Sequence, residues 1–252
     1  MSRRRAEVRA ALHGVEGYFS ESEAFALHEV VRTLAAPSDR PLRVVEIGSY
    51  MGRSTIAAAL ALRARGHGNV VSVDPHAPTG KASYAAEHGW RETFAEFTAN
   101  VARAGVSGFV LPVRATSEEA RAAYDGVPID VLFIDGSHDE EDVRFDSVAW
   151  LPLLADRAVV AYNDPYAPGV NRVIREELRS PNFSISNLRH VNNTLFADVR
   201  KGARSKPAEL LALSAYAYVE RQRFKLWKLA LRSLFAALGV VYRERKTVPM
   251  ES

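Results

Sequence analysis

Side chains able to bind a metal or move a proton follow two apolar stretches of the sequence. Asp135 ends the stretch VLFID and precedes His138 by three positions, while Asn163 and Asp164 end the stretch AVVAYND. Oxygen ligands in a chain without cysteine suit a hard cation such as Mg²⁺. We therefore predict a metal site made by Asp135, Asn163 and Asp164. His138 is the predicted base, since a neutral histidine accepts a proton from a hydroxyl that a metal has acidified, and Asp135 is the second catalytic residue. The alternatives are that the two acids only cap the following helices, and that His138 is a surface residue with Asp139 as the base.

A second candidate site is the glycine turn in VVEIGSYMGRST, residues 44–55. Gly48 and Gly52 let the backbone adopt a positive φ or approach a ligand closely. Their spacing matches neither the dinucleotide fingerprint nor a phosphate loop, which has a lysine after its last glycine. Glu46 precedes the turn, and Asp74 ends the next apolar stretch, where an acid in such folds bridges ribose hydroxyls. These acids suit a cationic ligand with a ribose, and S-adenosylmethionine carries a sulfonium, an ammonium and a ribose. A purely structural turn is the alternative.

The elements that must position these residues alternate along the chain. Short apolar runs rich in β-branched residues indicate buried parallel strands at residues 43–48, 69–74, 109–113, 129–136 and 158–164. Amphipathic segments between them predict helices, so the fold class is a doubly wound α/β sheet with helices on both faces. Two further strands, at 182–188 and 192–199, are too close for a crossover helix, and we expect an antiparallel hairpin. The acids that end the parallel strands should therefore share one edge of the sheet.

Helical segments flank this sheet domain, which we place at residues 41–200. In the N-terminal segment, residues 1–40, Ser20 and Glu23 predict a capping box that opens a helix over 20–35. Residues 201–252 form a tail in which an extended basic amphipathic helix begins near Pro207. Its apolar positions are Phe224, Trp227, Leu231, Leu234 and Leu238, and its basic stripe is Arg221, Lys225, Lys228 and Arg232. Such a helix must cover something. It packs on the domain or on another copy, which would make the protein a homo-oligomer, or it lies on an anionic membrane.

Composition narrows the function further. The chain has 252 residues and no cysteine, which excludes zinc ribbons, disulfides and thiol nucleophiles. It lacks an apolar run of about 18 residues, so we expect a cytoplasmic protein, with peripheral contact at the inner membrane face if the tail binds lipid. The tail has a formal charge of +7 and the remainder −4. A nucleic-acid-binding protein usually carries its basic face on the folded domain, so we expect no nucleic-acid partner.

The glycine turn resembles the first motif of class I S-adenosylmethionine-dependent methyltransferases, and it is especially similar to the catechol O-methyltransferase-like branch. An acid, two glycines around an aromatic residue, and a serine carry the resemblance: Glu46, Gly48, Tyr50, Gly52 and Ser54. The resemblance extends over roughly residues 20–200 and implies that these five bind the amino-acid end and backbone side of the cofactor. It also implies that Asp74 binds the ribose and that Ser117, with Thr116, contacts the adenine, although a plain helix N-cap is equally consistent with these two.

The same resemblance implies that Asp135 and Asp164 are metal ligands. The order Asn163-Asp164 is reversed relative to catechol-type members and is closer to sugar and antibiotic-tailoring, macrocin-type enzymes. His138 stands where catechol-type enzymes have a lysine base. Residues 75–90, which follow a strand end, form either a lid over the ligand or a plain surface loop.

These features together predict an S-adenosylmethionine-dependent, metal-assisted O-methyltransferase. The expected acceptor is a hydroxyl of a vicinal diol, because neighbouring oxygens chelate a metal, and the tailoring branch implies a sugar, a glycosylated natural product or a glycolipid. Two alternatives remain open. A metal-dependent hydroxylase would use the same scaffold and edge with an oxidant, and a non-catalytic scaffold protein would keep the fold and use its tail for membrane or partner contacts.

Overall fold

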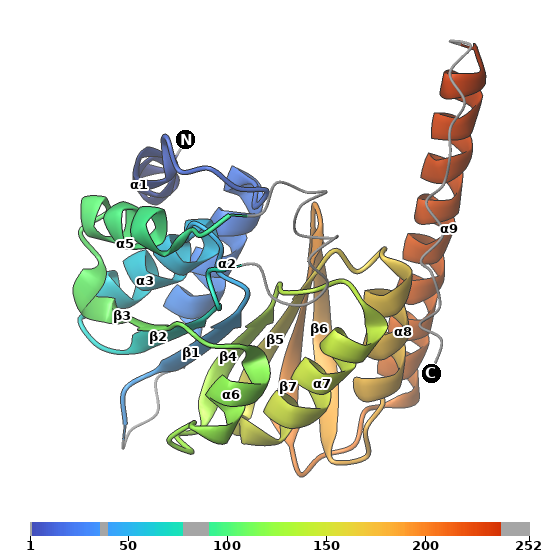
Figure 1. Cartoon of the computed structure of the whole chain (residues 1–252). Coiled ribbons are helices and arrows are strands. Elements are labelled where there is room, and N and C mark those ends of the chain that lie inside the picture. The colour runs from blue at the N-terminus through green and yellow to red at the C-terminus, as the bar shows by residue number, and fades with distance from the viewer. Residues whose placement is uncertain (1, 36–39, 78–90, 238–252) are drawn as a thin grey trace.

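A seven-stranded sheet forms the centre of the computed structural model, which describes residues 2–35, 40–77 and 91–237, with side chains described as far as residue 226. The strands are β1 (Arg43–Ile47), β2 (Asn69–Val73), β3 (Val110–Val113), β4 (Ile129–Ile134), β5 (Leu154–Asn163), β6 (Phe183–Val191) and β7 (Thr194–Lys201). Their order across the sheet is β3-β2-β1-β4-β5-β7-β6 (Figure 1). Strands β1 to β5 are parallel, and β7 pairs antiparallel with both β5 and β6. The predicted five parallel strands and closing hairpin are thus confirmed.

Alternating side chains of the central strands enter two separate hydrophobic cores. In β1, Val44 belongs to one core and Val45 to the other, and in β5 Val159 and Val160 divide in the same way. This period of two is the geometry of a strand buried on both faces. It explains why these strands are nearly continuous apolar runs in the sequence.

Helices cover both faces of the sheet, as predicted (Figure 1). One face carries α1 (Arg3–Leu12), α2 (Glu21–Thr33), α3 (Arg53–Arg65) and α5 (Phe94–Arg103), and the other carries α6 (Ser117–Ala122), α7 (Glu140–Trp150), α8 (Pro168–Glu177) and α9 (Pro207–Ala237). The capping box is present at the start of α2, where Ser20 and Glu23 exchange side-chain to backbone hydrogen bonds. The N-terminal helices share the core beside α3, so the segment from residue 2 to residue 35 packs as part of the same body.

Helix α9 joins the second core through its first half. Leu213 and Ala217 are buried, and Asn171 of α8 donates to the Ala217 carbonyl at 3.0 Å. Packing on the domain is therefore confirmed for this half. The helix then continues beyond the sheet (Figure 1). Of its predicted stripes, Trp227, Leu231, Leu234, Lys228 and Arg232 lie where side chains are not described, and Leu238 lies outside the described residues. Self-association and membrane contact by this part stay predictions.

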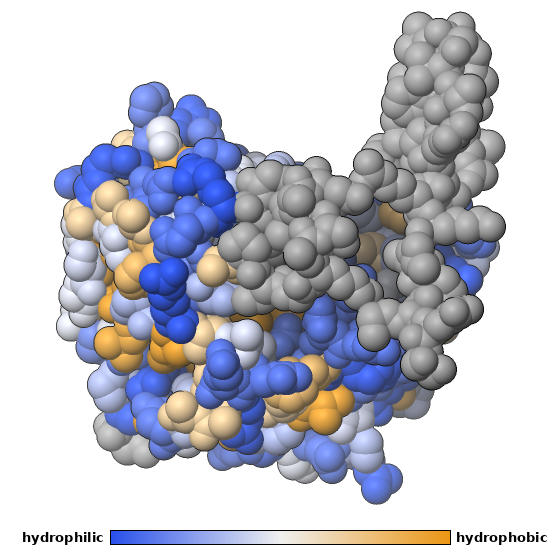
Figure 2. Space-filling view, viewed as in Figure 1, coloured by the Kyte–Doolittle hydropathy of each residue, from blue (hydrophilic) through white to orange (hydrophobic). Residues whose placement is uncertain are grey.

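Hydrophobic residues on the face seen in Figure 2 occur in small groups among hydrophilic ones. Within the described ranges, no helix is long and apolar enough to cross a membrane.

Candidate functional site

The predicted glycine turn links β1 to α3 in a left-handed conformation. Gly48, Tyr50 and Gly52 have φ angles of +85°, +45° and +89°. A Cβ on Gly48 would lie 2.3 Å from the carbonyl oxygen of Asp135 at the end of β4, so only glycine fits there. Gly52 is the N-cap of α3 and lies against Phe97. The turn is therefore packed directly on the strand end that carries the second group of predicted site residues.

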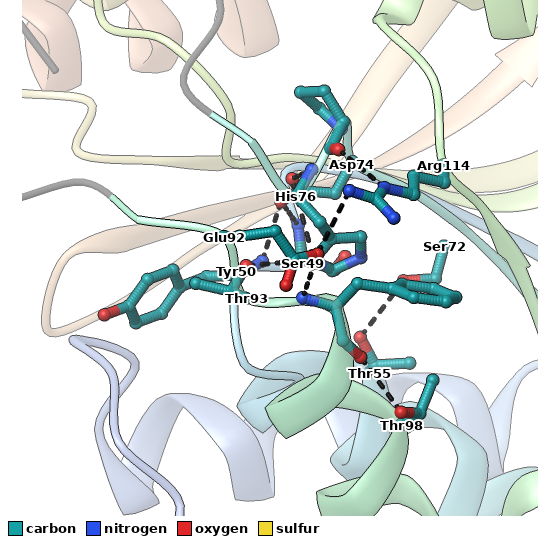
Figure 3. Close-up of polar contacts among 12 residues, drawn as sticks. Ser49, Tyr50, Thr55, Ser72, Asp74, His76, Glu92, Thr93, Thr98 and Arg114 are labelled. Atoms are coloured by element: carbon teal, nitrogen blue, oxygen red, sulfur yellow. Dashed lines mark hydrogen bonds and ion pairs between the residues drawn. The ribbon is translucent and has the colours of Figure 1, made fainter.

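Asp74 holds this turn in place. Its Oδ2 accepts hydrogen bonds from the backbone amides of Ser49 at 2.9 Å and Tyr50 at 2.8 Å, and its Oδ1 accepts from the His76 amide at 2.7 Å (Figure 3). The carboxylate thus fixes the peptide groups of the predicted cofactor motif, a use that the sequence analysis did not foresee. Its predicted contact with a ribose stays a prediction.

Glu46 of β1 and Ser54 in the first turn of α3 are buried on either side of the glycine turn. Glu46 is 2% exposed and accepts hydrogen bonds from Thr55 and, at 3.5 Å, from Ser72. Burial raises the pKa of Glu46 to about 7, although the hydroxyls of Ser54 and Thr55 act in the opposite direction. Its Oε1 has no hydrogen-bond partner among the described residues. Direct contact of Glu46 or Ser54 with a ligand stays a prediction, and what the structure provides is a buried acid beside the turn.

Ser49 and His76 are additional candidates that the sequence analysis missed. Both are buried, and Ser49 Oγ and His76 Nε2 lack a hydrogen-bond partner within the described ranges. His76 has a φ of +52°, its Nδ1 lies 3.1 Å from Thr93 Oγ1, and its ring packs against Phe97. Burial lowers the pKa of His76, which favours a neutral ring. Its position two residues after Asp74 was the available signal (Figure 3).

Ser117 is engaged in packing one helix on another. Thr116, one residue earlier, is the N-cap of α6 and forms a capping box with Glu119. Ser117 Oγ accepts from Trp150 Nε1 at 3.0 Å and also lies beside Asp146, whose carboxyl it hydrogen-bonds. The N-cap alternative is thus realised by Thr116, and the adenine contact of Ser117 stays a prediction.

The second group of predicted residues meets at the ends of β4 and β5. The amide of Asn163 hydrogen-bonds the carboxyl of Asp135, and Asp164 is close enough that its charge raises the pKa of Asp135. The pKa of Asp135 is well above its ordinary value. Burial is the main cause, and the negative charges of Glu46 and Asp164 raise the pKa further. The three predicted metal ligands are therefore neighbours, and the acid beside the glycine turn is coupled to them electrostatically.

Asp164 is held in a strained position beside the predicted base. Its φ is +46°, and its backbone amide donates to the Asn193 carbonyl at 2.7 Å, inside the hairpin that follows. One carboxylate oxygen, Oδ2, lies 3.1 Å from Nε2 of the half-exposed His138. The other, Oδ1, is buried and has no partner in the described part of the chain. An unusual φ at a bulky polar residue commonly marks a functional position.

Across the described ranges, no group of three or more His, Cys, Asp and Glu side chains has the arrangement of a metal site. The predicted set consists of two carboxylates and one amide, and the amide Oδ1 of Asn163 accepts from Thr194 Oγ1 at 3.1 Å. Metal binding by Asp135, Asn163 and Asp164 stays a prediction.

Comparison with known protein families finds a match over the middle of the chain. Residues 45–165, which include both groups of site residues, match the family model described as a methyltransferase domain. No curated protein sequence matches the chain.

Solved structures share the fold at low sequence identity. The cofactor-bound Rv0187 from MTB is 19% identical, with a TM-score of 0.58 over 81% of this chain and 92% of that chain. The O-methyltransferase TomG from Streptomyces achromogenes, in complex with SAM, is 19% identical, with a TM-score of 0.54 over 80% and 91%. The O-methyltransferase from Bacillus cereus, in complex with SAH, is 18% identical, with a TM-score of 0.54 over 80% and 92%. The chain thus has the fold of these proteins.

Proposed function

We propose that the chain is an S-adenosylmethionine-dependent methyltransferase and that it methylates a hydroxyl oxygen of a vicinal diol with the help of a divalent cation. Two proteins of the same fold are described as O-methyltransferases, and one of them is in complex with SAM. The proposed cation is Mg²⁺, held by Asp135, Asn163 and Asp164, and the proposed base is His138. The acceptor we expect is a sugar or a glycosylated molecule.

The observation that carries this proposal is a group of buried acids at one edge of the sheet, where ionisation of each carboxyl group is unfavourable without a compensating cation. Glu46 and Asp135 both have raised pKa values because they are buried and because they repel other acids, Asp74 in the first case and Asp164 in the second. Glu46 Oε1 and Asp164 Oδ1 are buried without a partner among the described residues. A buried carboxylate is costly unless a cation or donors compensate it. A cationic cofactor and a metal ion would supply that compensation.

The chain's own residues fit a cofactor with these charges. The turn is already held in its left-handed form by Asp74, so little ordering is needed when a ligand arrives. The buried hydroxyl of Ser49, which has no partner within the described residues, remains able to bind a polar group. S-adenosylmethionine, when bound, supplies the methyl group on a sulfonium. The acceptor oxygen forms the new O–C bond as the S–C bond breaks, and the hydroxyl proton leaves to a base.

We assign the role of base to His138, and its contact with Asp164 supports this assignment. A proton on Nε2 would be donated to Asp164 Oδ2 at 3.1 Å, which leaves Nδ1 as the acceptor for the substrate's proton. Asp164 would orient the ring and stabilise the imidazolium that forms. Asp139 remains the alternative base.

The oxygens near Asp164 support the metal part of the proposal. Oδ1 of Asp164 has no partner among described residues, while Oδ2 contacts His138, so the carboxylate has one oxygen for each task. Thr194 Oγ1 lies 3.1 Å from Asn163 and 3.0 Å from Glu23 Oε1, and one hydroxyl proton serves only one of them. A rotated Asn163 amide would donate to Thr194 and turn its oxygen toward Asp135. A cation bound there would lower the pKa of a coordinated acceptor hydroxyl.

Methyl transfer with matched acceptors tests the proposal. The full-length protein would be incubated with labelled S-adenosylmethionine and pairs of glycosides that differ only by removal of one of two neighbouring hydroxyls, with Mg²⁺ or with EDTA. We expect transfer only to the diol, with loss of turnover in EDTA and in Asp164→Ala while cofactor affinity is kept. Equal transfer to diol and deoxy acceptors would contradict the diol. Full turnover of Asp164→Ala in EDTA would contradict the metal.

A further inference from the structure

A pocket of about 300 Å³ lies between α8 and α9, outside the residues assigned above. Two aromatic rings, a proline, an asparagine and four cations line it: Tyr166, Phe224, Pro168, Asn171, Arg172, Arg175, Arg221 and Lys225. The two helices lie side by side (Figure 1). Asn171 fixes their spacing, because its Nδ2 donates to the carbonyls of Pro165 and Ala217, each at 3.0 Å. The walls of the pocket are thus set by a buried hydrogen-bonded side chain.

The cations of the pocket are incompletely neutralised. Arg172 pairs with Glu140 at 2.9 Å. In the described part of the chain, Arg175, Arg221 and Lys225 have no acidic partner, and Arg175 Nε is a buried atom without a hydrogen bond. Unpaired guanidinium groups match the geometry of a phosphate, to which they donate in pairs. The pocket therefore has an excess of positive charge suited to an anion.

The remaining lining is apolar and leads to the catalytic edge. The rings of Tyr166 and Phe224 are stacked, with centroids 6.2 Å apart. Tyr166 also lies against Asp164. Its hydroxyl is close enough to the Asp164 carboxylate for the two groups to interact. The pocket is therefore one side chain away from the Asp164 and His138 pair. An anion bound in it would sit beside the acceptor position, with ring or carbon atoms of the same molecule against the aromatic pair.

We propose that this pocket binds the phosphate group of the acceptor, so that the methylated hydroxyl belongs to a phosphorylated molecule such as a sugar phosphate. This inference rests on the proposed function for the role of the neighbouring edge. A volume of about 300 Å³ is at the lower end for small-molecule sites, which fits one phosphate with a few further atoms. The positive tail and negative body would help to guide an anionic acceptor toward this end of the molecule.

Calorimetric titration of the full-length protein with glucose 1-phosphate and with glucose tests the pocket. We expect binding of the phosphate ester only, weakened about tenfold for each cation removed, as in Arg221→Gln and Lys225→Gln. Arg179→Gln is the charge-matched control, because Arg179 donates to Ser214 between the same two helices and does not line the pocket. Equal affinity in the pocket variants and the control, or no binding to the wild type, would overturn the inference.

Two further experiments distinguish this inference from the proposed function and from binding of a lipid headgroup. Titration of the same samples with S-adenosylmethionine tests the proposed function: cofactor binding without phosphate binding overturns only the pocket, and phosphate binding without cofactor binding overturns only the methyltransferase mechanism. Sedimentation with vesicles of phosphatidylcholine, with or without phosphatidylglycerol, tests a lipid headgroup as the phosphate source. Vesicle binding that depends on Arg221 and Lys225, without binding of glucose 1-phosphate, would overturn the small-molecule assignment.

Discussion

The glycine turn after β1 lies beside the acidic ends of β4 and β5, but the two regions differ in how well their polar groups are satisfied by hydrogen bonds. In the turn, the Asp74 carboxylate accepts hydrogen bonds from the backbone amides of Ser49 and Tyr50, so the chain itself stabilises an unusual backbone conformation. At the strand ends, Asp135 has a raised pKa and Asp164 has a buried oxygen without a partner among the described residues. The first region is preorganised, and the second is destabilised until a positive charge arrives. We infer that the turn positions the cofactor and that the strand ends carry out the chemistry.

The largest effect on stability should come from a substitution that creates a steric clash between the glycine turn and the end of β4. In Gly48→Ala, the new Cβ would lie 2.3 Å from the Asp135 carbonyl oxygen at a φ of +85°, so we expect a loss of at least about 3 kcal/mol in the free energy of unfolding and no cofactor binding. Gly66→Ala is the matched control. Gly66 is the C-cap of α3, the helix that follows the turn, and its φ is +79°. A Cβ added there would have no atom within 4 Å. This substitution should cost about 1 kcal/mol. Equal losses in urea unfolding would contradict the close packing.

Removing the proposed base should lower the rate of methyl transfer without changing the affinity for the cofactor. His138→Ala is expected to lower the rate of methyl transfer by about 10² to 10⁴-fold, the usual contribution of a positioned base, with cofactor affinity unchanged. Asp139→Ala serves as the comparison, because Asp139 is the alternative base. If Asp139→Ala lowers the rate and flattens its pH profile while His138→Ala does not, the assignment is reversed.

The cost of the buried acids should appear in the pH dependence of stability. The pKa of Glu46 is about 7 in the folded protein against an ordinary value of 4.5, so between these pH values the folded state retains a proton that the unfolded state releases. Stability from this group is therefore present below about pH 4.5 and is lost as the pH rises through 7, by about 3 kcal/mol at most. Glu46→Gln should remove much of this slope in urea unfolding. An unchanged slope would contradict the raised pKa of Glu46.

The smallest effect is expected at the outer side of the turn. The hydroxyl of Tyr50 donates to Glu16 at 3.2 Å in an exposed position, so Tyr50→Phe should change stability by no more than about 0.5 kcal/mol and leave cofactor affinity unchanged. A loss of cofactor affinity above tenfold would show that the aromatic hydroxyl binds the ligand.

Local patterns were sufficient to predict the fold and the proximity of the side chains at the ends of two neighbouring strands. Periodicity and β-branched runs located every strand to within a few residues, and the short link between the last two predicted the hairpin. Asp135, Asn163 and Asp164 were expected together because parallel strands end at one edge, and the Asn163 contact with Asp135 confirms their proximity.

The details that depend on distant contacts were not predictable. Asp74 bonds the amides of residues 25 and 24 positions earlier, and the left-handed φ of Asp164 depends on the Asn193 carbonyl of the hairpin. His76 was missed, since its burial against Phe97 depends on a helix later in the chain. The pocket beside Tyr166 required the packing of α9, which the sequence left open between the domain, another copy and a membrane.

The most direct test of the central claim is a calorimetric titration of the full-length protein with S-adenosylmethionine and S-adenosylhomocysteine, with and without Mg²⁺. A turn that is preorganised in the absence of metal predicts micromolar binding of both compounds under both conditions, with Mg²⁺ required only for methyl transfer. Absence of binding under either condition would contradict the assignment of the turn as the cofactor site.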